Sequence, residues 1–378
     1  MGKTVESSRL ASLDGLRGLA AVVVLVHHTL LLVPGLAAPY FGQPTPPGLA
    51  SILVHTPLHL AWAGTEAVFL FFVLSGLVLA RSAGSAGFSW AGYFPSRIVR
   101  LYLPVAAGVL FALAVILLLP RTGPTESAWL ASRPDGYTPG GIVKDLILIG
   151  GSSDTVSPLW SLQWEVLFSL LLPVYLYASR RMPVALQFAI CIAASVAGNI
   201  VGNTSLKYLP MFGLGVALAA VWDRIPALVA RIPHRIAPLV WTLFTLACLV
   251  VAGSWWYLVP VLGLGRASAV TLGPVLLAIV GLVIAAVHAP GIRTLLSSRL
   301  FRRLGAISFS LYLVHEPLVI AVGHMLPHPE FALLLTVPVS LAVAWAFQRL
   351  IELPAHRLAR RVRRDAARRE QPAPAEVR

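Results

Sequence analysis

The hydrophobic residues of this chain gather into long apolar runs. A helix needs about 17 to 25 apolar residues to cross some 30 Å of hydrocarbon. Ten runs reach or approach that length: 16–33, 61–80, 101–119, 159–178, 184–201, 208–222, 237–252, 270–287, 304–326 and 331–350. The stretch 255–265 is apolar but short, so it is either re-entrant or interfacial. The pattern predicts an all-α, polytopic transmembrane helical bundle of about ten spans.

Composition agrees with a membrane protein and excludes several other classes. Of the 378 residues, 57% are hydrophobic and only 12% are charged, against about 25% charged residues in soluble domains. Such a chain cannot cover itself with a polar surface. The composition therefore excludes a disordered protein, a coiled coil and a disulfide-stapled secreted domain. Cys191 and Cys248 fall in separate apolar runs and are expected to be core thiols.

The net charge of +14 does not indicate a nucleic-acid partner, because the basic residues lie mostly between and after the apolar runs. Nine basic residues lie between 349 and 378, after the last run, where they are typical of the cytoplasmic side and of contact with anionic lipid headgroups. With both termini in the cytoplasm, five of the 29 Lys and Arg residues are external, namely Arg121, Arg133, Lys144, Lys207 and Arg266. This distribution favours an even number of spans. It divides the chain into a membrane domain, 1–354, and a basic cytoplasmic tail, 355–378.

The first run has a second interpretation. Its basic start and a small-x-small site at 35–37 are features of a signal peptide, but the run is long and has His27 and His28 in its middle.

No period of 20 to 50 residues repeats, which argues against a solenoid and against an obvious two-fold transporter. Segment 120–158 is rich in Pro, Gly and Ser, so we expect a loop over the outer face.

The first run also contains the clearest candidate site. Ionisable side chains inside hydrocarbon cost about 2.5 to 3.5 kcal/mol on insertion scales and mark functional positions. Arg17 and His28 are eleven residues apart, so on a helix they share one face and lie about 16.5 Å apart along it. Asp14 lies close enough to that face to pair with Arg17. A cation such as Arg17 at the cytoplasmic end of the helix and an imidazole such as His28 deeper in suit an elongated anionic substrate. The same geometry fits equally well if Arg17 is only a positive-inside anchor and His28 a packed core histidine.

Later runs contain further polar side chains. Ser75 stands in no G-x-S-x-G elbow, so Ser75 and Gly76 are expected to permit close helix packing. Glu66, near the outer interface, is either solvated or functional. Glu165, inside the fourth run and preceded by Trp160, needs a partner; it either orients a catalytic histidine, holds an arginine or forms a structural ion pair.

The ninth run carries a polar stripe. Tyr312, His315 and Glu316 fall on one helical face at i, i+3 and i+4, which is expected to face a cavity or a partner. His55 and His59 have the spacing of metal ligands, but Pro57 between them disfavours a continuous helix and no third ligand is evident. We expect no metal.

Six short motifs mark the chain between residues 13 and 354. They are L-D-G-L-R-G-L-A at 13–20 followed by His28, F-F-V-L-S-G at 71–76, the basic segment with Arg97, Arg100, Leu101 and Pro104, W-S-L at 160–162 with Glu165, the segment 308–317, and I-E-L-P at 351–354. In this order they resemble the signatures of the acyltransferase-3 family of polytopic membrane acyltransferases. The resemblance covers nearly the whole chain.

The resemblance implies transfer of an acyl group from cytoplasmic acyl-CoA, with acetyl-CoA as the first expectation, to a hydroxyl of an extracytoplasmic sugar, polysaccharide or glycosylated natural product. We expect His28 to be the general base, with Glu165 or Asp14 orienting it or balancing charge. The CoA phosphates need a cationic rim, for which we expect Arg17, Arg97, Arg100, Arg302 and Arg303. Substrate contacts are expected from Glu66, Ser75, Trp160, Tyr312 and His315. The Ala, Arg and Pro bias suits a high-GC bacterium and hence its plasma membrane.

The chain departs from the family pattern at several points. Phe69 stands where many members have an acidic residue, with Glu66 one turn earlier, and Glu316 stands where many have Trp. We expect the stand-alone form without the SGNH-type esterase domain of some members. Other interpretations are a secondary transporter that uses the intramembrane His and Glu as a proton relay, a protein that passes the acyl group to a separate partner, and a membrane scaffold. The oligomeric state, including a homo-oligomer, is open.

Overall fold

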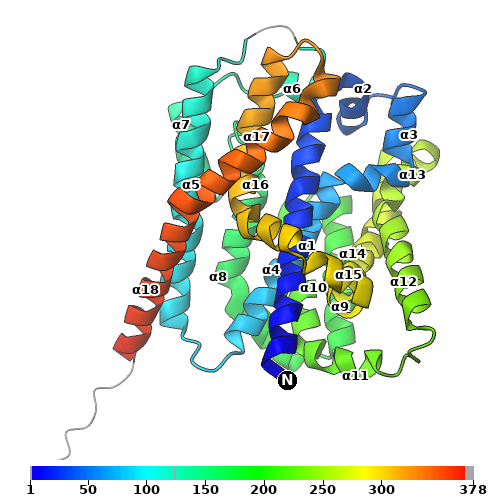
Figure 1. The fold of residues 1–378 in the computed structure, drawn as a ribbon, viewed down its shortest axis with the longest axis vertical. Coiled ribbons are helices and arrows are strands. Elements are labelled where there is room, and N and C mark those ends of the chain that lie inside the picture. Colours follow the sequence, from blue (N-terminus) through cyan, green and yellow to red (C-terminus); the bar gives the residue numbers. More distant parts are fainter. Residues whose placement is uncertain (1, 123–124, 371–378) are drawn as a thin grey trace, which may run out of the picture.

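The computed structural model describes residues 2–122 and 125–370, and this part of the chain is helical without a strand (Figure 1). The long helices are α1 (Gly2–Leu30), α4 (Gly64–Ala83), α5 (Trp90–Leu118), α8 (Leu159–Arg181), α9 (Val184–Ile200), α10 (Thr204–Val221), α12 (Ala237–Ala252), α14 (Leu264–His288), α16 (Arg299–Met325), α17 (Ala332–Phe347) and α18 (Leu353–Glu370). The shorter α-helices are α2 (Pro34–Ala37), α3 (Leu49–His55), α6 (Ala128–Ala131), α7 (Pro139–Ile147), α11 (Ile225–Val229), α13 (Ser254–Leu262) and α15 (Pro290–Leu296). The 3-10 turns are η1 (Ala38–Phe41), η2 (Pro57–Trp62), η3 (Trp222–Arg224) and η4 (Pro329–Phe331). A π-helical turn, η5 (Gln348–Glu352), precedes α18. The last part of the predicted tail, 371–378, lies outside the described residues.

The predicted polytopic helical bundle is confirmed, and each predicted run falls on a helix. Eight helices of the described chain are long and apolar enough to cross a membrane, or nine if α12 and α13 form one span. The estimate of about ten spans exceeds this number for two reasons. Helix α9 has only 17 residues, and α13, the short stretch already expected to be irregular, turns by 43° from α12.

The two ends of the bundle carry different elements. Helix α1 begins, and α18 finishes, at the end that also holds α11, whereas α2, α3, α6 and α7 lie at the opposite end (Figure 1). The start of α1 and the end of α18 therefore lie on the same side of the bundle, as an even number of crossings requires.

Helix α1 packs backbone to backbone against α16. A Cβ placed on Gly18 would lie 2.3 Å from the Gly305 nitrogen, and one on Gly305 would lie 2.2 Å from the Asp14 carbonyl oxygen. Gly15 approaches the Leu296 carbonyl in the same way, at 2.0 Å. Gly18 thus serves the contact of α1 with α16, and Gly15 serves its contact with Leu296 at the end of α15, since no larger residue fits at either position.

Helix α4 meets α10 through a second pair of glycines. A Cβ on Gly76 would lie 2.0 Å from the Phe212 carbonyl oxygen, and one on Gly215 would lie 2.1 Å from the Val73 carbonyl oxygen. The predicted role of Gly76 in close helix packing is confirmed. Phe72 stacks on Phe212 with ring centroids 4.6 Å apart, which fixes α4 against α10 beside the cavity described below.

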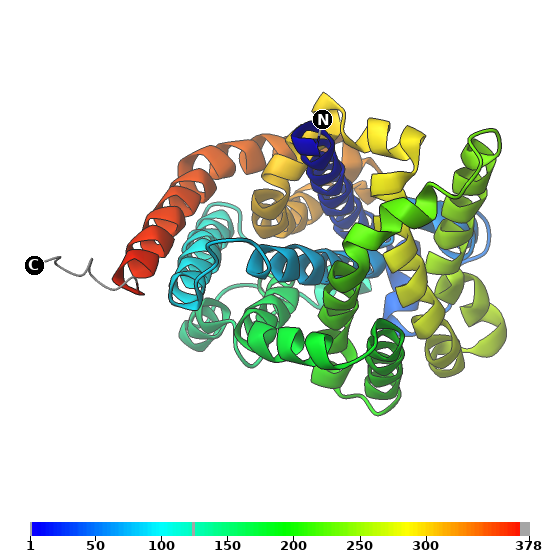
Figure 2. The same cartoon turned by 90° about the horizontal axis from the view of Figure 1, so that it is seen from below.

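Residues 355–370, which belong to the predicted cytoplasmic tail, form most of helix α18 and continue the bundle. Helix α18 lies along α5 (Figures 1 and 2) and buries Ala355 and Ala359, which are 3% and 4% exposed. The fit is close, because a Cβ on Gly92 of α5 would lie 2.7 Å from the Arg363 carbonyl oxygen. The small apolar stripe holds the helix on α5, while most of its arginines remain exposed.

The α1–α16 contact predicts a strong effect of one methyl group. Gly305→Ala should lower the melting temperature of the purified protein in detergent, because overpacking of this kind costs about 1 to 3 kcal/mol. Gly265→Ala is the matched control, since no atom lies within 4 Å of a Cβ at that position. Equal melting temperatures for the two variants would contradict the close backbone contact.

Candidate active site

A cavity of about 440 Å³ lies among α1, α4, α5, α8, α16, η5 and α18. Helix α1 supplies Asp14 and Arg17 at one side, and η5 and α18 supply Gln348, Glu352 and His356 at the other. Most of the predicted site residues line it: Asp14, Arg17, Ser75, Arg97, Arg100, Glu165, Arg302 and Tyr312. We call this space the main cavity.

Each carboxylate of the main cavity has a partner in its wall. Arg17 Nη2 lies 3.0 Å from Asp14 Oδ1. Arg97 Nη2 donates to Glu165 Oε1 at 2.8 Å, and to Ser169 Oγ at 3.0 Å. The carboxylate of Glu352 accepts a hydrogen bond from Ser310 Oγ at 2.5 Å and lies 3.7 Å from His356 Nε2.

Two further guanidinium groups, Arg100 and Arg302, line the same space. Four arginines and three carboxylates line the cavity, so it keeps an excess of positive charge. Such a cavity favours an anionic ligand, and guanidinium groups bind phosphates with directed hydrogen bonds.

The main cavity ends at a layer of polar and aromatic side chains. Ser161 and Tyr312 line it and share a hydrogen bond of 2.7 Å between their hydroxyls. The Tyr312 ring lies edge-on to Phe71, with centroids 5.8 Å apart, and 6.0 Å from the ring of His315. The histidine therefore lies directly behind this layer as seen from the cavity.

His28 and His315 form a hydrogen-bonded pair. His28 Nδ1 lies 2.9 Å from His315 Nε2, and His315 Nδ1 lies 2.8 Å from the Leu311 carbonyl oxygen. A carbonyl can only accept, so Nδ1 of a neutral His315 carries the proton and its Nε2 accepts. His28 Nδ1 is then the donor, which leaves the lone pair of His28 Nε2 available. The pair fixes the tautomer of His28 without a carboxylate.

The expected partners of His28 lie elsewhere. Asp14 precedes it by fourteen residues on α1, about 21 Å along a helix axis, and pairs with Arg17. The partner of Glu165 is Arg97. Of the arrangements considered for Glu165, the structure shows the ion pair with an arginine, and His315 holds the position next to His28.

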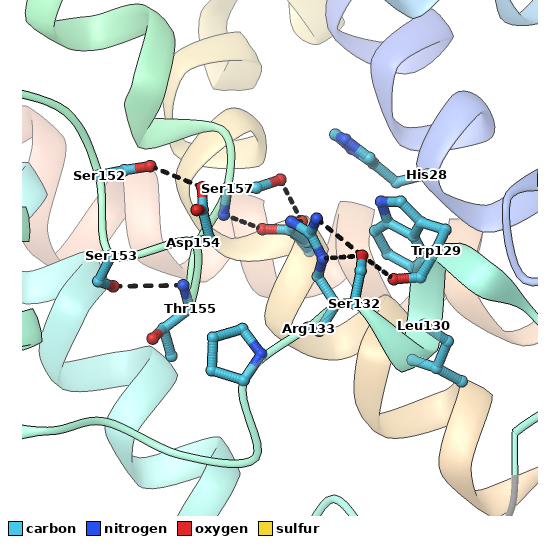
Figure 3. A network of polar contacts seen from close by, with 12 residues as sticks. His28, Trp129, Leu130, Ser132, Arg133, Ser152, Ser153, Asp154, Thr155 and Ser157 are labelled. Carbon is cyan, nitrogen blue, oxygen red and sulfur yellow. Dashed lines mark hydrogen bonds and ion pairs between the residues drawn. The ribbon is translucent and has the colours of Figure 1, made fainter. Parts of the chain in front are cut away.

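On the side of His28 away from the main cavity, segment 120–158 folds over the bundle, where a loop was expected. Trp129 of α6 stacks on His28 with ring centroids 5.6 Å apart and planes at 26°. The guanidinium of Arg133 lies 5.5 Å from the centre of the Trp129 ring. Figure 3 shows His28, Trp129 and Arg133 side by side in this network.

A buried carboxylate anchors the same segment. Glu316, which is fully buried, accepts hydrogen bonds from both the backbone nitrogen and the hydroxyl of Ser157, and Arg133 Nη1 lies 3.7 Å from it. Ser127 Oγ adds a hydrogen bond of 2.5 Å to the Leu31 carbonyl at the end of α1. Glu316, which stands where many family members have Trp, therefore holds segment 120–158 over His28 through hydrogen bonds and the charge of Arg133.

The remaining predicted residues lie outside the main cavity. Glu66 accepts a hydrogen bond of 3.2 Å from Trp256 Nε1 in a separate aromatic cluster. Trp160 packs against Phe72 and Tyr208, with centroids 6.3 and 5.0 Å apart. Arg303 is exposed and is not part of the cavity wall.

The two histidines with metal-ligand spacing have other partners. His55 Nδ1 lies 2.9 Å from the Trp256 carbonyl, and its Nε2 lies 3.0 Å from Thr45 Oγ1. Burial, with smaller effects from His27 and His55, lowers the pKa of His59 to about 2, so its ring is neutral at physiological pH. Within residues 2–122 and 125–370, no three His, Cys, Asp or Glu side chains form a group that could hold a metal ion.

Several residues of the site were missed from the sequence. Glu352 belongs to the I-E-L-P motif, and a carboxylate at the end of an apolar run is itself a signal of a buried site. His356 falls within the predicted tail. Trp129, Arg133 and Ser157 lie in a loop-rich segment, where hydrophobic periodicity carries no information about how the chain folds back.

Comparison with known proteins agrees with these landmarks. The acyltransferase-3 family model, described as an acyltransferase domain, matches residues 10–349. Acyltransferase MdmB of Streptomyces mycarofaciens is 28% identical over an alignment of length 332 that covers 84% of this chain and 81% of that protein. O-acetyltransferase PaAT-1 of Phomopsis amygdali is 27% identical over an alignment of length 382 that covers 85% of this chain and 74% of that protein. No solved structure gives a significant match. The family match covers nearly the whole chain, with five of the six motifs and most of the residues that line the main cavity, and the chain belongs to the acyltransferase-3 family of membrane acyltransferases.

Proposed function

We propose that this protein is an acyl-CoA-dependent O-acyltransferase of the bacterial plasma membrane. It moves an acyl group, acetyl in the first instance, from cytoplasmic acyl-CoA to a hydroxyl of an extracytoplasmic sugar, polysaccharide or glycosylated natural product. The observation that carries the proposal is the arginine-lined main cavity, whose inner residue Tyr312 lies next to the His28–His315 pair. The name O-acetyltransferase of the Phomopsis relative supports an oxygen acceptor and an acetyl group.

The donor enters the main cavity from the cytoplasmic side in this proposal. The Lys and Arg distribution assigns that side to the end where α1 begins. Arg17, Arg100 and Arg302 give this side of the cavity the positive charge that attracts the anionic donor, and the pantetheine arm extends inward between Ser75 and Phe71. The thioester then reaches the layer formed by Ser161 and Tyr312. Arg303, outside the cavity wall, has no contact with the donor in this arrangement.

His28 Nε2 acts as the general base. It takes the proton of the acceptor hydroxyl while the hydroxyl oxygen attacks the thioester carbonyl carbon. The new C–O bond forms, the C–S bond breaks, and the proton passes from His28 to the sulfur of CoA. His315 keeps the His28 Nδ1 proton in place throughout, so that Nε2 is the basic atom.

The acceptor approaches His28 from the opposite side, under segment 120–158. Trp129 offers an aromatic face beside His28, and aromatic faces pack well against sugar rings and flat natural products. Glu316 and Ser157 hold the segment there. The segment between α5 and α8 is therefore the element that selects the acceptor.

Replacement of the proposed base should remove activity. His28→Ala is expected to lower acceptor-dependent release of CoA from acetyl-CoA by about 10²- to 10⁴-fold, the usual contribution of a general base. Protein in nanodiscs, a thiol reagent and a panel of glycosides provide the assay, with mass spectrometry of the product. His328→Ala, at an exposed histidine paired with Glu330, is the matched control and should retain activity. An active His28→Ala enzyme, or acceptor flux across the membrane without acylation, would overturn the proposal in favour of a transporter.

His315 should act through His28. His315→Phe keeps a ring in the stack but removes the acceptor for the His28 Nδ1 proton, so kcat should fall by about 10²- to 10⁴-fold, as when an orienting residue fixes the wrong tautomer. His315→Gln restores an acceptor oxygen and should recover part of the loss. The pH profile of kcat/KM should change in His315→Phe and move back in His315→Gln. Equal kcat in all three proteins would show that His315 has only a packing role.

Trp129 should affect the acceptor rather than the donor. Trp129→Leu is expected to raise the KM of the acceptor by up to about tenfold, because it removes an aromatic contact worth about 0.5 to 1.5 kcal/mol. The KM of acetyl-CoA should stay at the wild-type value. Trp345→Leu, at a tryptophan that is 55% exposed, is the control. A raised donor KM with an unchanged acceptor KM would place Trp129 on the donor side instead.

A further inference from the structure

A second cavity lies beside the main one and belongs to no step described so far. It has a volume of about 250 Å³ and lies between the end of α4, the start of α5 and helix α18. Arg97, Arg100 and His356 line both cavities, so the two spaces share a wall. Arg360 and Arg363 of α18 complete the basic side of the second cavity, and Phe88 and Tyr93 form its aromatic side.

The charge of the second cavity differs from that of the main one. Asp14, Glu165 and Glu352 balance arginines in the main cavity, whereas none of the described residues that line the second cavity is acidic. Arg97 pairs with Glu165, and the other three guanidinium groups, those of Arg100, Arg360 and Arg363, have no carboxylate among the lining residues. An anion with several charges relieves their mutual repulsion. The arrangement favours a ligand that carries more than one phosphate group.

The second cavity is also a fixed structure. Ala355 and Ala359 are buried against the neighbouring helices, and the Arg363 backbone lies against Gly92 of α5. Phe88 and Tyr93 pack with ring centroids 5.6 Å apart, and Tyr93 donates a hydrogen bond of 3.3 Å to the Ser169 carbonyl. Arg360 and Arg363 are therefore held beside an aromatic surface rather than on a free tail.

Phosphates next to an aromatic surface are the chemistry of a nucleotide. We propose that the second cavity binds the 3′-phosphorylated adenosine diphosphate end of the acyl-CoA donor, while the main cavity takes the pantetheine arm and the acyl group. This inference rests on the proposed function, because it assigns a place to the nucleotide of the same donor. It gives α18, expected from the sequence to contact lipid headgroups, a role in substrate binding.

The shared wall favours this ligand over an anionic lipid. A donor whose two ends occupy adjoining cavities passes Arg97 and Arg100, which face both spaces. A lipid headgroup bound to Arg360 and Arg363 gains nothing from that continuity. The test separates the two sources of phosphate by varying the lipid and the donor independently.

The variant Arg360→Gln/Arg363→Gln removes two positive charges and keeps the Cβ and Cγ atoms that pack near Gly92. We expect the KM of acetyl-CoA to rise at least tenfold, because charged hydrogen bonds to phosphate are strong. The KM of S-acetylpantetheine, which has no nucleotide, should not change, and kcat at saturating donor should stay at the wild-type value. Acetyl-dephospho-CoA, which lacks the 3′-phosphate, should show a smaller rise in KM than acetyl-CoA. Arg361→Gln/Arg364→Gln, with the same charge loss on the same helix but outside the cavity wall, is the matched control.

A binding measurement makes the test independent of turnover. Adenosine 3′,5′-bisphosphate should bind to wild type and to the control by titration calorimetry, and at least tenfold more weakly to Arg360→Gln/Arg363→Gln. If wild type binds this probe but turns over no acyl-CoA, the proposed function fails and the nucleotide subsite stands. A wild-type KM for acetyl-CoA in the variant, or equal increases for acetyl-CoA and S-acetylpantetheine, would overturn the subsite. An effect seen in nanodiscs with anionic phosphatidylglycerol and absent in neutral phosphatidylcholine would assign the arginines to lipid instead.

Discussion

The contact between the backbones of α1 and α16 determines where His28 and His315, the proposed reacting base and its partner, lie. Gly18 meets Gly305 so closely that a Cβ on Gly18 would lie 2.3 Å from the Gly305 nitrogen. His28 follows Gly18 by ten residues, and His315 follows Gly305 by ten. A helix rises about 1.5 Å per residue, so one crossing point at the glycines brings the two histidines opposite each other about 15 Å further along. The same contact keeps Arg17 at the main cavity. The close contact of Gly18 with Gly305 thus sets the relative position of His28 and His315, which lie in different motifs.

The histidine pair avoids the charge that a carboxylate would bring to the same place. An ionised Asp or Glu beside His28 would have to be desolvated within the bundle, which is costly unless several hydrogen bonds compensate. Here the chain of hydrogen bonds runs from His28 through His315 to the Leu311 carbonyl, and it contains no carboxylate. The carboxylates of the region are placed elsewhere, at Glu165 with Arg97 and at Glu316 with Ser157 and Arg133. The sequence led us to expect that the same carboxylates orient His28 and balance charge. In the structure His315 contacts His28, and the carboxylates pair with other residues.

How much the sequence could reveal depended on how local each feature is. Apolar runs predicted the helices, and the spacing of Arg17 and His28 placed both on one face of α1, because helical periodicity relates near neighbours in the chain. The span count differed where a helix is short, as in α9, or bends, as at α12 and α13. His315 is 287 residues from His28, so no spacing rule joins them. Ser157, Trp129 and the cavity face of α18 were missed for the same reason, since tertiary packing alone decides what a loop or a terminal helix covers.

The layers on either side of the histidine pair answer a problem that the proposed reaction poses. In that proposed reaction, donor and acceptor approach from opposite faces of the membrane, and water at the thioester would compete with the acceptor hydroxyl. On the donor side, Tyr312 is 6% exposed and hydrogen-bonded to Ser161. On the acceptor side, Trp129 is 5% exposed and stacks on His28. The two layers belong to different parts of the chain. Helices α8 and α16 form the layer on the donor side, and segment 120–158 forms the layer on the acceptor side. One substrate can therefore displace its layer while the other layer remains closed. The acyl group can then cross at the histidines without a continuous water path through the bundle.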